Sequence, residues 1–280
     1  MENRNSDRYL CLVTKMNPDM LLAVETDEWW VESLACLQAA YPYRVAKPQN
    51  NHYGMTFFSK LPIEDVEVRF LVENDVPSIH ASFQLPSGDT IFFHGLHPRP
   101  PHPYPLTDAT TRDAELITVG KSVKEENQPA IVAGDLNDVA WSHTTRLFQR
   151  ISGLLDPRIG RGMYNSFHAS LPLFRWPLDH EFHSRHFQLV ELQRLPAFGS
   201  DHFPIYVKLH YEPLISGEQP LPAATVEDHQ EAEEKIDNAE EVTGRPVESP
   251  QEEVVAPPQK VDQIVQSAST DYGKGSCSYS

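Results

Sequence analysis

Short apolar runs alternate with amphipathic stretches along the first 211 residues of the chain. Apolar runs of strand length, rich in β-branched and aromatic residues, occur at 20–24, 43–46, 55–59, 66–72, 79–85, 91–97, 130–137, 176–183, 187–195 and 202–209. Apolar residues recur at helical spacing over 7–16, 29–41, 110–125 and 142–151. The pattern predicts one folded domain of mixed α and β structure over residues 1–211.

The composition changes after residue 211. Residues 211–280 contain 15 acidic and 4 basic residues, so most of the net charge of −17 belongs to the end of the chain. Runs such as EDHQEAEEKIDNAEE and SPQEEVVAPPQ cannot bury enough apolar surface to offset the entropy that is lost on ordering. We therefore expect residues 212–280 to form a disordered acidic tail, in which residues 225–242 form at most a transient helix without a sustained apolar stripe.

Charge and hydropathy limit the classes of function. A domain that holds long duplex DNA by neutralising phosphates normally carries a basic excess, but this chain has 23 Lys and Arg against 40 Asp and Glu. No run approaches the roughly 18 apolar residues of a membrane span, and the first residues, MENRNSDRYL, are too polar for a signal peptide. As written, the sequence is that of a soluble protein, cytoplasmic by default.

Polar residues with catalytic potential border the apolar runs of the predicted strands. They are Glu25, His94 with His97, Asp135 with Asn137, Asp179 with His180, and Asp201 with His202. Strand ends meet at one rim of a layered sheet, where loops present side chains to a ligand. Carboxylates that converge there repel one another unless a hard cation lies between them, and oxygen ligands suit Mg²⁺ or Mn²⁺. A histidine beside them donates to an oxyanion or transfers a proton near neutral pH.

Each cluster taken alone has a simpler structural interpretation. Glu25 fits a capping carboxylate, and GDLND at 134–138 fits an Asx turn. An EF-hand is excluded because Arg146 stands where the bidentate Glu is required, and the contiguous residues 200–202 cannot line up as a nucleophilic triad. Three histidines fit a solvent-exposed strand and turn, with zinc binding as a minority alternative: His180, His183 and His186. The ordered set of clusters, rather than any single one, indicates a catalytic site.

Five motifs occur in the order, spacing and strand context of a known superfamily. They are LAVETD around Glu25, HGLHP around His97, GDLN at 134–137, LDHEF at 178–182 and SDHFP at 200–204. The set resembles the endonuclease/exonuclease/phosphatase superfamily, the fold of pancreatic deoxyribonuclease, apurinic endonucleases, inositol-polyphosphate phosphatases and neutral sphingomyelinases. The resemblance covers residues 1–211 and is nearest to a bacterial group whose domain often follows membrane-spanning helices. It implies an α+β fold, a four-layer α/β/β/α sandwich of two mostly antiparallel sheets.

The resemblance also implies residues that bind the metal and the phosphate. Glu25 would ligate a catalytic Mg²⁺ or Mn²⁺, and Asp201 would support the metal side. Asn137 would hold the scissile phosphate, and His97 would stabilise a phosphate oxygen. In-line attack on a phosphate ester needs its anionic charge screened by such groups.

The remaining motif residues are implied to move protons. Asp135 would orient or deprotonate the attacking water. His202, oriented by Asp179, would hydrogen-bond the developing phosphorane charge or assist proton transfer. Asp135 and His202 both remain candidates for the main base. Arg112 in TTRDAEL matches a helix position of the family pattern, and we expect it to have a structural role.

One departure from the family pattern concerns the start of the chain. Members begin with an apolar strand that ends in an Asn of the metal site, about one helix-plus-strand unit before the Glu. Here that strand would lie upstream of Met1, so an N-terminally truncated domain is expected, with Asn3 and Asn5 as available substitutes. A missing inner strand would leave two unpaired sheet edges. With an earlier start, membrane attachment through an upstream segment is expected as well.

The resemblance predicts a Mg²⁺- or Mn²⁺-dependent phosphoesterase, such as a phosphodiesterase or nuclease, acting on nucleic acid, an inositol phosphate or a phospholipid. The alternative is a non-catalytic module that binds phosphorylated ligands, while the acidic tail engages a basic partner. A calcineurin-like metallophosphatase is more distant, because the sequence has no D-x-H before Asp135 and has GSDH in place of G-x-H. The acidic balance favours a small or membrane-embedded phosphoester over long nucleic acid. No feature of the sequence indicates an obligate oligomer.

Overall fold

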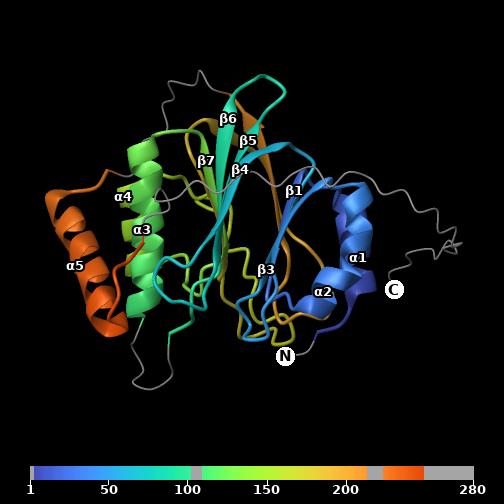
Figure 1. Cartoon of the computed structure of the whole chain (residues 1–280), viewed down its shortest axis with the longest axis horizontal. Helices are drawn as coiled ribbons and strands as arrows, with labels where there is room; N and C mark the ends of the chain where they lie inside the picture. The colour runs from blue at the N-terminus through green and yellow to red at the C-terminus, as the bar shows by residue number, and fades with distance from the viewer. Residues whose placement is uncertain (1–2, 102–108, 213–222, 249–280) are drawn as a thin grey trace, which may run out of the picture.

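The computed structural model describes residues 3–101, 109–212 and 223–248. Two β-sheets pack face to face (Figure 1). Helices α1 (Ser6–Met16) and α2 (Glu28–Ser33) cover one side, and α3 (Thr110–Glu126), α4 (His143–Ser152) and α5 (Val226–Thr243) cover the other. This is the predicted four-layer sandwich, with α5 added outside α3 and α4. None of the helices within these described ranges is both long enough and apolar enough to cross a membrane.

The larger sheet has five strands in the order β4 (Ile63–Arg69), β5 (Ser78–Gln84), β6 (Thr90–Leu96), β7 (Ala130–Asp135) and β8 (Asp179–His183). Neighbours are antiparallel except β6 and β7, which run parallel and are joined by α3. Parallel strands need such a crossover, and they end at the same edge of the sheet. The register also sets Asp135, the last residue of β7, opposite Asp179, the first residue of β8. Strand pairing alone therefore brings two of the predicted site carboxylates together.

The second sheet is divided into two parts. Strands β1 (Met20–Val24), β3 (Met55–Ser59) and β2 (Tyr43–Lys47) pair antiparallel in that order, and β10 (Ile205–Tyr211) pairs antiparallel with β9 (Phe187–Arg194). Among the described strands, β1 pairs only with β3 and β10 only with β9, and residues of both line a cavity of about 380 Å³. Each of these two strands therefore has one edge without a described strand partner.

Apolar side chains alternate between the layers with the period of two that strands impose. In β3, Phe57 lies in the core between the sheets, and Phe58 packs with Tyr9 of α1 on the outer side. In β7, Ile131 joins the core between the sheets, and Val132 lies in the core that α3 and α4 cover. Both faces of these strands are buried, which explains why their sequences are nearly continuous apolar runs.

The predicted elements are found, with shifted ends and two larger differences. The helix expected over 29–41 is split into α2 and a 3₁₀ helix, η1 (Ala35–Ala39), and the fully buried Leu34 lies between them. The strand expected over 66–72 begins earlier and ends at Arg69. Leu71 and Val72 leave the sheet because they pack into the core beneath α3 and α4.

The predicted disordered tail is wrong for residues 223–248, because they contain helix α5 (Val226–Thr243), which is packed against the domain. Helix α5 begins with a capping box formed by Thr225 and Asp228. Its buried Ala232 and Ala239 join the core of α3 and α4, since small side chains allow close packing without a broad apolar stripe. Ion pairs with basic residues of α3 and α4 offset its acidic charge: Lys121 with Glu233, and Arg150 with Asp228. Residues 249–280 lie outside the described residues.

Substitution Ala239→Glu is expected to release α5 from α3 and α4. A carboxylate at this fully buried position has no room and no cation, so the free energy of unfolding should fall by about 1–3 kcal/mol. Denaturant unfolding and hydrogen exchange of the α5 amides measure the effect. Val242→Glu, at a residue of the same helix that is 60% exposed, is the matched control and should behave like the wild type. Equal unfolding of both variants would show that α5 does not dock as described.

Candidate active site

The predicted site residues gather where strands of both sheets end. His97 follows β6, Asp135 ends β7 and Asp179 begins β8, all at one edge of the five-stranded sheet. His202 precedes β10 and forms a backbone bridge with Phe167. Since β6 and β7 are parallel and β8 is antiparallel to β7, His97, Asp135 and Asp179 lie at the same edge of this sheet. The structure therefore brings these four predicted residues close together.

Asp135 lies between two imidazoles. Its Oδ2 atom is 3.8 Å from His97 Nε2 and 3.6 Å from His202 Nε2. On the far side of its ring, His202 donates from Nδ1 to Asp179 Oδ2 at 2.7 Å. Asp135 is 5% exposed, whereas the side chains of Asp179 and His202 are about one quarter exposed. The arrangement is a buried carboxylate that faces a histidine held in place by a second carboxylate.

The electrostatics follow from this burial. Burial raises the pKa of Asp135 to about 7, and the nearby Asp179 charge adds to the effect while His202 opposes it. Burial alone would lower the pKa of His202, but the hydrogen bond and charge of Asp179, with the charge of Asp135, raise it to about 9. Burial, with the charge of His202, lowers the pKa of His97 to about 4. Near neutral pH, the site thus combines an imidazolium, a neutral imidazole and a carboxylate whose pKa suits proton transfer.

The loop after β7 is fixed by its own hydrogen bonds. Asn137 adopts a left-handed backbone, φ 50°, in which its amide N–H donates to Asp135 Oδ1 at 2.9 Å. Its side-chain Nδ2 donates to the Pro98 carbonyl oxygen at 2.9 Å. The Asn137 side chain and backbone thus link the loop after β7 to the residue that follows His97 and to Asp135.

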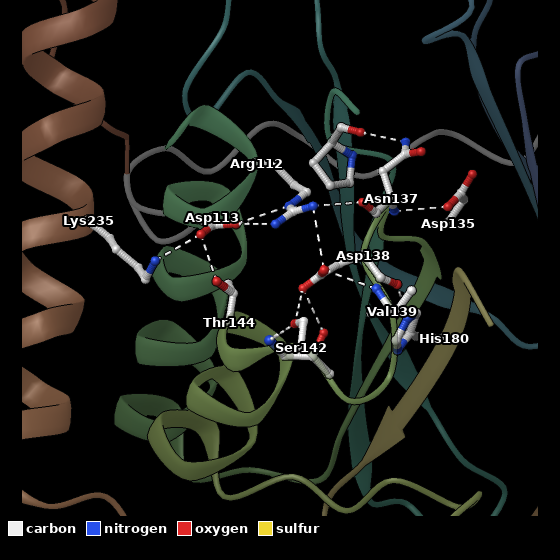
Figure 2. Close-up of polar contacts among 12 residues, drawn as sticks. Arg112, Asp113, Asp135, Asn137, Asp138, Val139, Ser142, Thr144, His180 and Lys235 are labelled. Atoms are coloured by element: carbon white, nitrogen blue, oxygen red, sulfur yellow. Dashed lines mark hydrogen bonds and ion pairs between the residues drawn. The ribbon is translucent and has the colours of Figure 1, made fainter. Parts of the chain in front are cut away.

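Arg112 and Asp138 connect this loop to helices α3 and α4, as Figure 2 shows. Arg112 donates from Nη1 to the Asn137 carbonyl oxygen at 2.8 Å, in agreement with the structural role expected for it. Asp138 accepts hydrogen bonds from Ser142 and Thr145 at the start of α4. Sequence reasoning missed Asp138, although its place directly after GDLN and four residues before the helix cap Ser142 was a usable signal.

Two histidines that the sequence linked to the site face elsewhere. His94 pairs with His80 through their Nδ1 atoms at 2.8 Å. His180 donates from Nε2 to the Asp138 carbonyl oxygen and accepts from Arg158 at Nδ1, so it supports the loop from inside the protein. The expectation of a solvent-exposed histidine series is wrong here, because His180 and His183 are buried in β8.

Glu25 follows β1 in the second sheet and lines the same cavity as Asp179 and His202. It has a left-handed backbone, φ 57°, and a side chain that is 48% exposed with Oε2 3.8 Å from His52 Nδ1. Its negative charge contributes to the raised pKa of Asp135. Asp201 accepts at its carbonyl oxygen from the Ala169 amide, and its charge helps to raise the pKa of His202. Glu25 thus affects the pKa of Asp135, and Asp201 affects the pKa of His202.

No three His, Cys, Asp or Glu side chains within 3–101, 109–212 and 223–248 form a ready-made metal cluster. The donor chemistry nevertheless fits Mg²⁺ or Mn²⁺, because Mg²⁺ is commonly held by one or two carboxylates, with water and substrate oxygens completing the shell. Glu25 is exposed enough to bind in this way, and the mutual repulsion of Glu25, Asp135 and Asp179 is what a cation relieves. Asn3 lines the same cavity as Glu25 and His202, and its side chain lies against Gly199.

An apolar loop that the sequence reasoning did not single out flanks His202. Phe167 and Trp176 pair at its base, and the Phe167 ring centroid is 4.9 Å from that of His202. Between them, Leu171, Leu173 and Phe174 are exposed. The only sequence signal was the apolar run SLPLF, which has neither strand nor helix periodicity.

Comparison with known proteins agrees with the fold. TDP2 of D. rerio, complexed with a single-strand DNA product, is similar with a TM-score of 0.62 and 16% identity over 74% of this chain and 92% of that chain. The human Nocturnin catalytic domain with bound sulfate gives 0.59 and 15%, over 75% and 88%. A mannosyl-6-phosphatase of Bacteroides thetaiotaomicron gives 0.55 and 19%, over 74% and 91%.

These identities show a shared fold, and sequence comparison adds the family. None of the curated proteins is significantly similar to this chain in sequence. The model of the endonuclease/exonuclease/phosphatase family, however, matches residues 7–202, which is more than half of the chain and includes Glu25, Asp135 and His202. The chain therefore belongs to the endonuclease/exonuclease/phosphatase family.

Proposed function

We propose that this protein is a divalent-metal-dependent phosphoester hydrolase. The observation that carries the proposal is the buried Asp135 between His97 and His202, with His202 held by Asp179. A carboxylate with a raised pKa beside a protonated imidazole supplies both a proton acceptor and a donor to an anionic transition state. Both groups accelerate the in-line hydrolysis of a phosphoester.

Each residue has one role in this proposal. Asp135 accepts the proton of the attacking water, and His202 donates a hydrogen bond to a phosphate oxygen as negative charge develops there. His97 and the side-chain amide of Asn137 hold the remaining phosphate oxygens. A divalent cation held by Glu25, with Asp201 on its side, supplies positive charge against the phosphate when bound. Asp179 keeps His202 in its protonated, oriented state.

The comparisons support phosphate esters as the substrate class. The neighbours include one protein complexed with a DNA product, one with bound sulfate and one named as a sugar phosphatase. The exposed apolar loop beside His202 adds that the ester group has room for an apolar or aromatic part, such as a nucleobase or a lipid. Hydrolysis assays on nucleic acid, an inositol phosphate and a phospholipid would distinguish these substrate classes. The alternative, a module that binds phosphorylated ligands without turnover, is an outcome of the tests below.

The first test is Asp135→Asn with bis-p-nitrophenyl phosphate and p-nitrophenyl phosphate as substrates in Mg²⁺ or Mn²⁺. Loss of the proton acceptor should lower kcat by roughly 10²- to 10⁴-fold, and EDTA should abolish the wild-type activity. The control is Asp19→Asn, whose side chain is 76% exposed and which precedes β1, at the end of that strand opposite to Glu25. Activity of Asp135→Asn equal to that of the control would overturn the proposal. Calorimetric binding of a phosphodiester analogue without any turnover would favour the binding module.

A second test addresses the orientation of His202. Asp179→Asn keeps the shape of the side chain but removes the charge that holds the imidazole, so kcat should fall by roughly 10²-fold or more while KM changes less. Steady-state kinetics on the same substrates measures this split. The matched control is Asp75→Asn, an exposed carboxylate paired with Arg99. A wild-type kcat in Asp179→Asn would show that His202 needs no orienting carboxylate.

A further inference from the structure

Helix α5 lies outside the residues that the family model matches, yet it is connected to the catalytic loop. Lys235, near the middle of α5, donates from Nζ to Asp113 Oδ2 at 2.8 Å. Asp113 in turn accepts from Arg112, and Arg112 donates to the carbonyl oxygen of Asn137. Figure 2 shows these residues as one continuous chain of polar contacts from α5 to Asp135.

The guanidinium of Arg112 is shared between two groups in a fixed geometry. Its Nε and Nη2 atoms donate to Asp113 Oδ1 at 3.0 and 2.7 Å. Its Nη1 atom donates to the Asn137 carbonyl oxygen at 2.8 Å and lies 3.5 Å from Asp138 Oδ1. Because the guanidinium is planar and rigid, the position of Asp113 sets the direction in which Nη1 points. The orientation of one carboxylate on α3 therefore controls the support of the loop.

The second oxygen of Asp113 decides that orientation. Asp113 Oδ2 accepts from Thr144 at 2.6 Å and from Lys235 at 2.8 Å. Asp113 is 7% exposed, and although burial alone would raise its pKa, Arg112, Lys235 and Thr144 together hold that pKa below its ordinary value. Without Lys235, the buried carboxylate would keep Thr144 on Oδ2 but would have Arg112 as its one remaining cation, so it would shift toward Arg112 and draw Nη1 away from the loop.

We propose that Lys235 of α5 is a positioning residue for the catalytic loop 134–138, acting through Asp113 and Arg112. The effect on catalysis rests on the proposed function. The effect on the position of the loop rests on the contacts alone. It gives the acidic C-terminal helix a role in the site, whereas the family match ends at residue 202.

The other ion pairs of α5 provide an internal control. Lys121 of α3 binds Glu233 of α5 at 2.6 Å, so it joins the same two helices as Lys235 does. No hydrogen bond or ion pair described for Lys121 continues to Arg112 or to the loop. Loss of either lysine removes one contact of α5, but only the loss of Lys235 interrupts the chain that ends at Asn137.

The experiment compares Lys235→Met with Lys121→Met in the full-length protein. The first measurement is hydrogen exchange of the loop amides, where Leu136 N–H donates to Leu178 and Asn137 N–H donates to Asp135. Exchange in 134–138 should be faster in Lys235→Met and unchanged in Lys121→Met. The second measurement is steady-state kinetics with bis-p-nitrophenyl phosphate in Mg²⁺. We expect kcat of Lys235→Met to fall about 3- to 30-fold, with KM within about twofold, and Lys235→Arg to restore it.

The α5 amides, measured in the same exchange experiment, show whether the helix stays docked. If Lys235→Met releases α5, Lys235→Gln, which keeps a hydrogen-bond donor without the charge, replaces it as the deciding variant. Loop exchange and kcat that are the same in the Lys235 and Lys121 variants would overturn the inference. A wild-type protein without metal-dependent hydrolysis would overturn the proposed function instead, and the exchange measurement would still decide whether Lys235 positions the loop.

Discussion

The site depends on one constraint, which is that a carboxylate is buried beside a second carboxylate. Asp135 and Asp179 are register partners on adjacent strands, so the fold forces their charges together. His202 lies against both, and its positive charge is what makes the arrangement tolerable in a buried position. The same constraint raises the pKa of Asp135 and of His202. The two groups whose pKa values the fold perturbs are therefore also the groups suited to proton transfer.

The structure around this constraint is built to keep the loop after β7 from moving. Asn137 is held by its backbone to Asp135 and by its side chain to Pro98, which follows His97. Arg112 reaches the same loop from α3, and His180 reaches it from β8. A loop with a left-handed residue at its centre needs such support, because its backbone groups find no partners in a regular helix or sheet.

The sequence predicted most of the elements, and it placed His97, Asp135, Asp179 and His202 at strand ends, because period-two apolar runs and the polar residues at their ends are local signals. It did not predict the packing of α5, whose acidic composition is typical of disorder. The helix is stabilised by Ala232 and Ala239 together with cations on α3 and α4, and these partners are distant in sequence. The buried state of His180 was missed for the same reason, since Arg158 and the Asp138 carbonyl become its partners only after folding.

The two parts of the site are supported to different degrees, and this difference suits their proposed tasks. Asp135 lies in a five-stranded sheet that is covered on both faces, and its side chain is buried. Glu25 follows β1, which among the described strands pairs with β3 alone and which borders the cavity, and its side chain is half exposed. A proton acceptor requires a fixed, dry environment, whereas a carboxylate that binds an exchangeable hard cation must remain open to water. In the proposed function, the division of the second sheet therefore leaves the metal-binding carboxylate open to water.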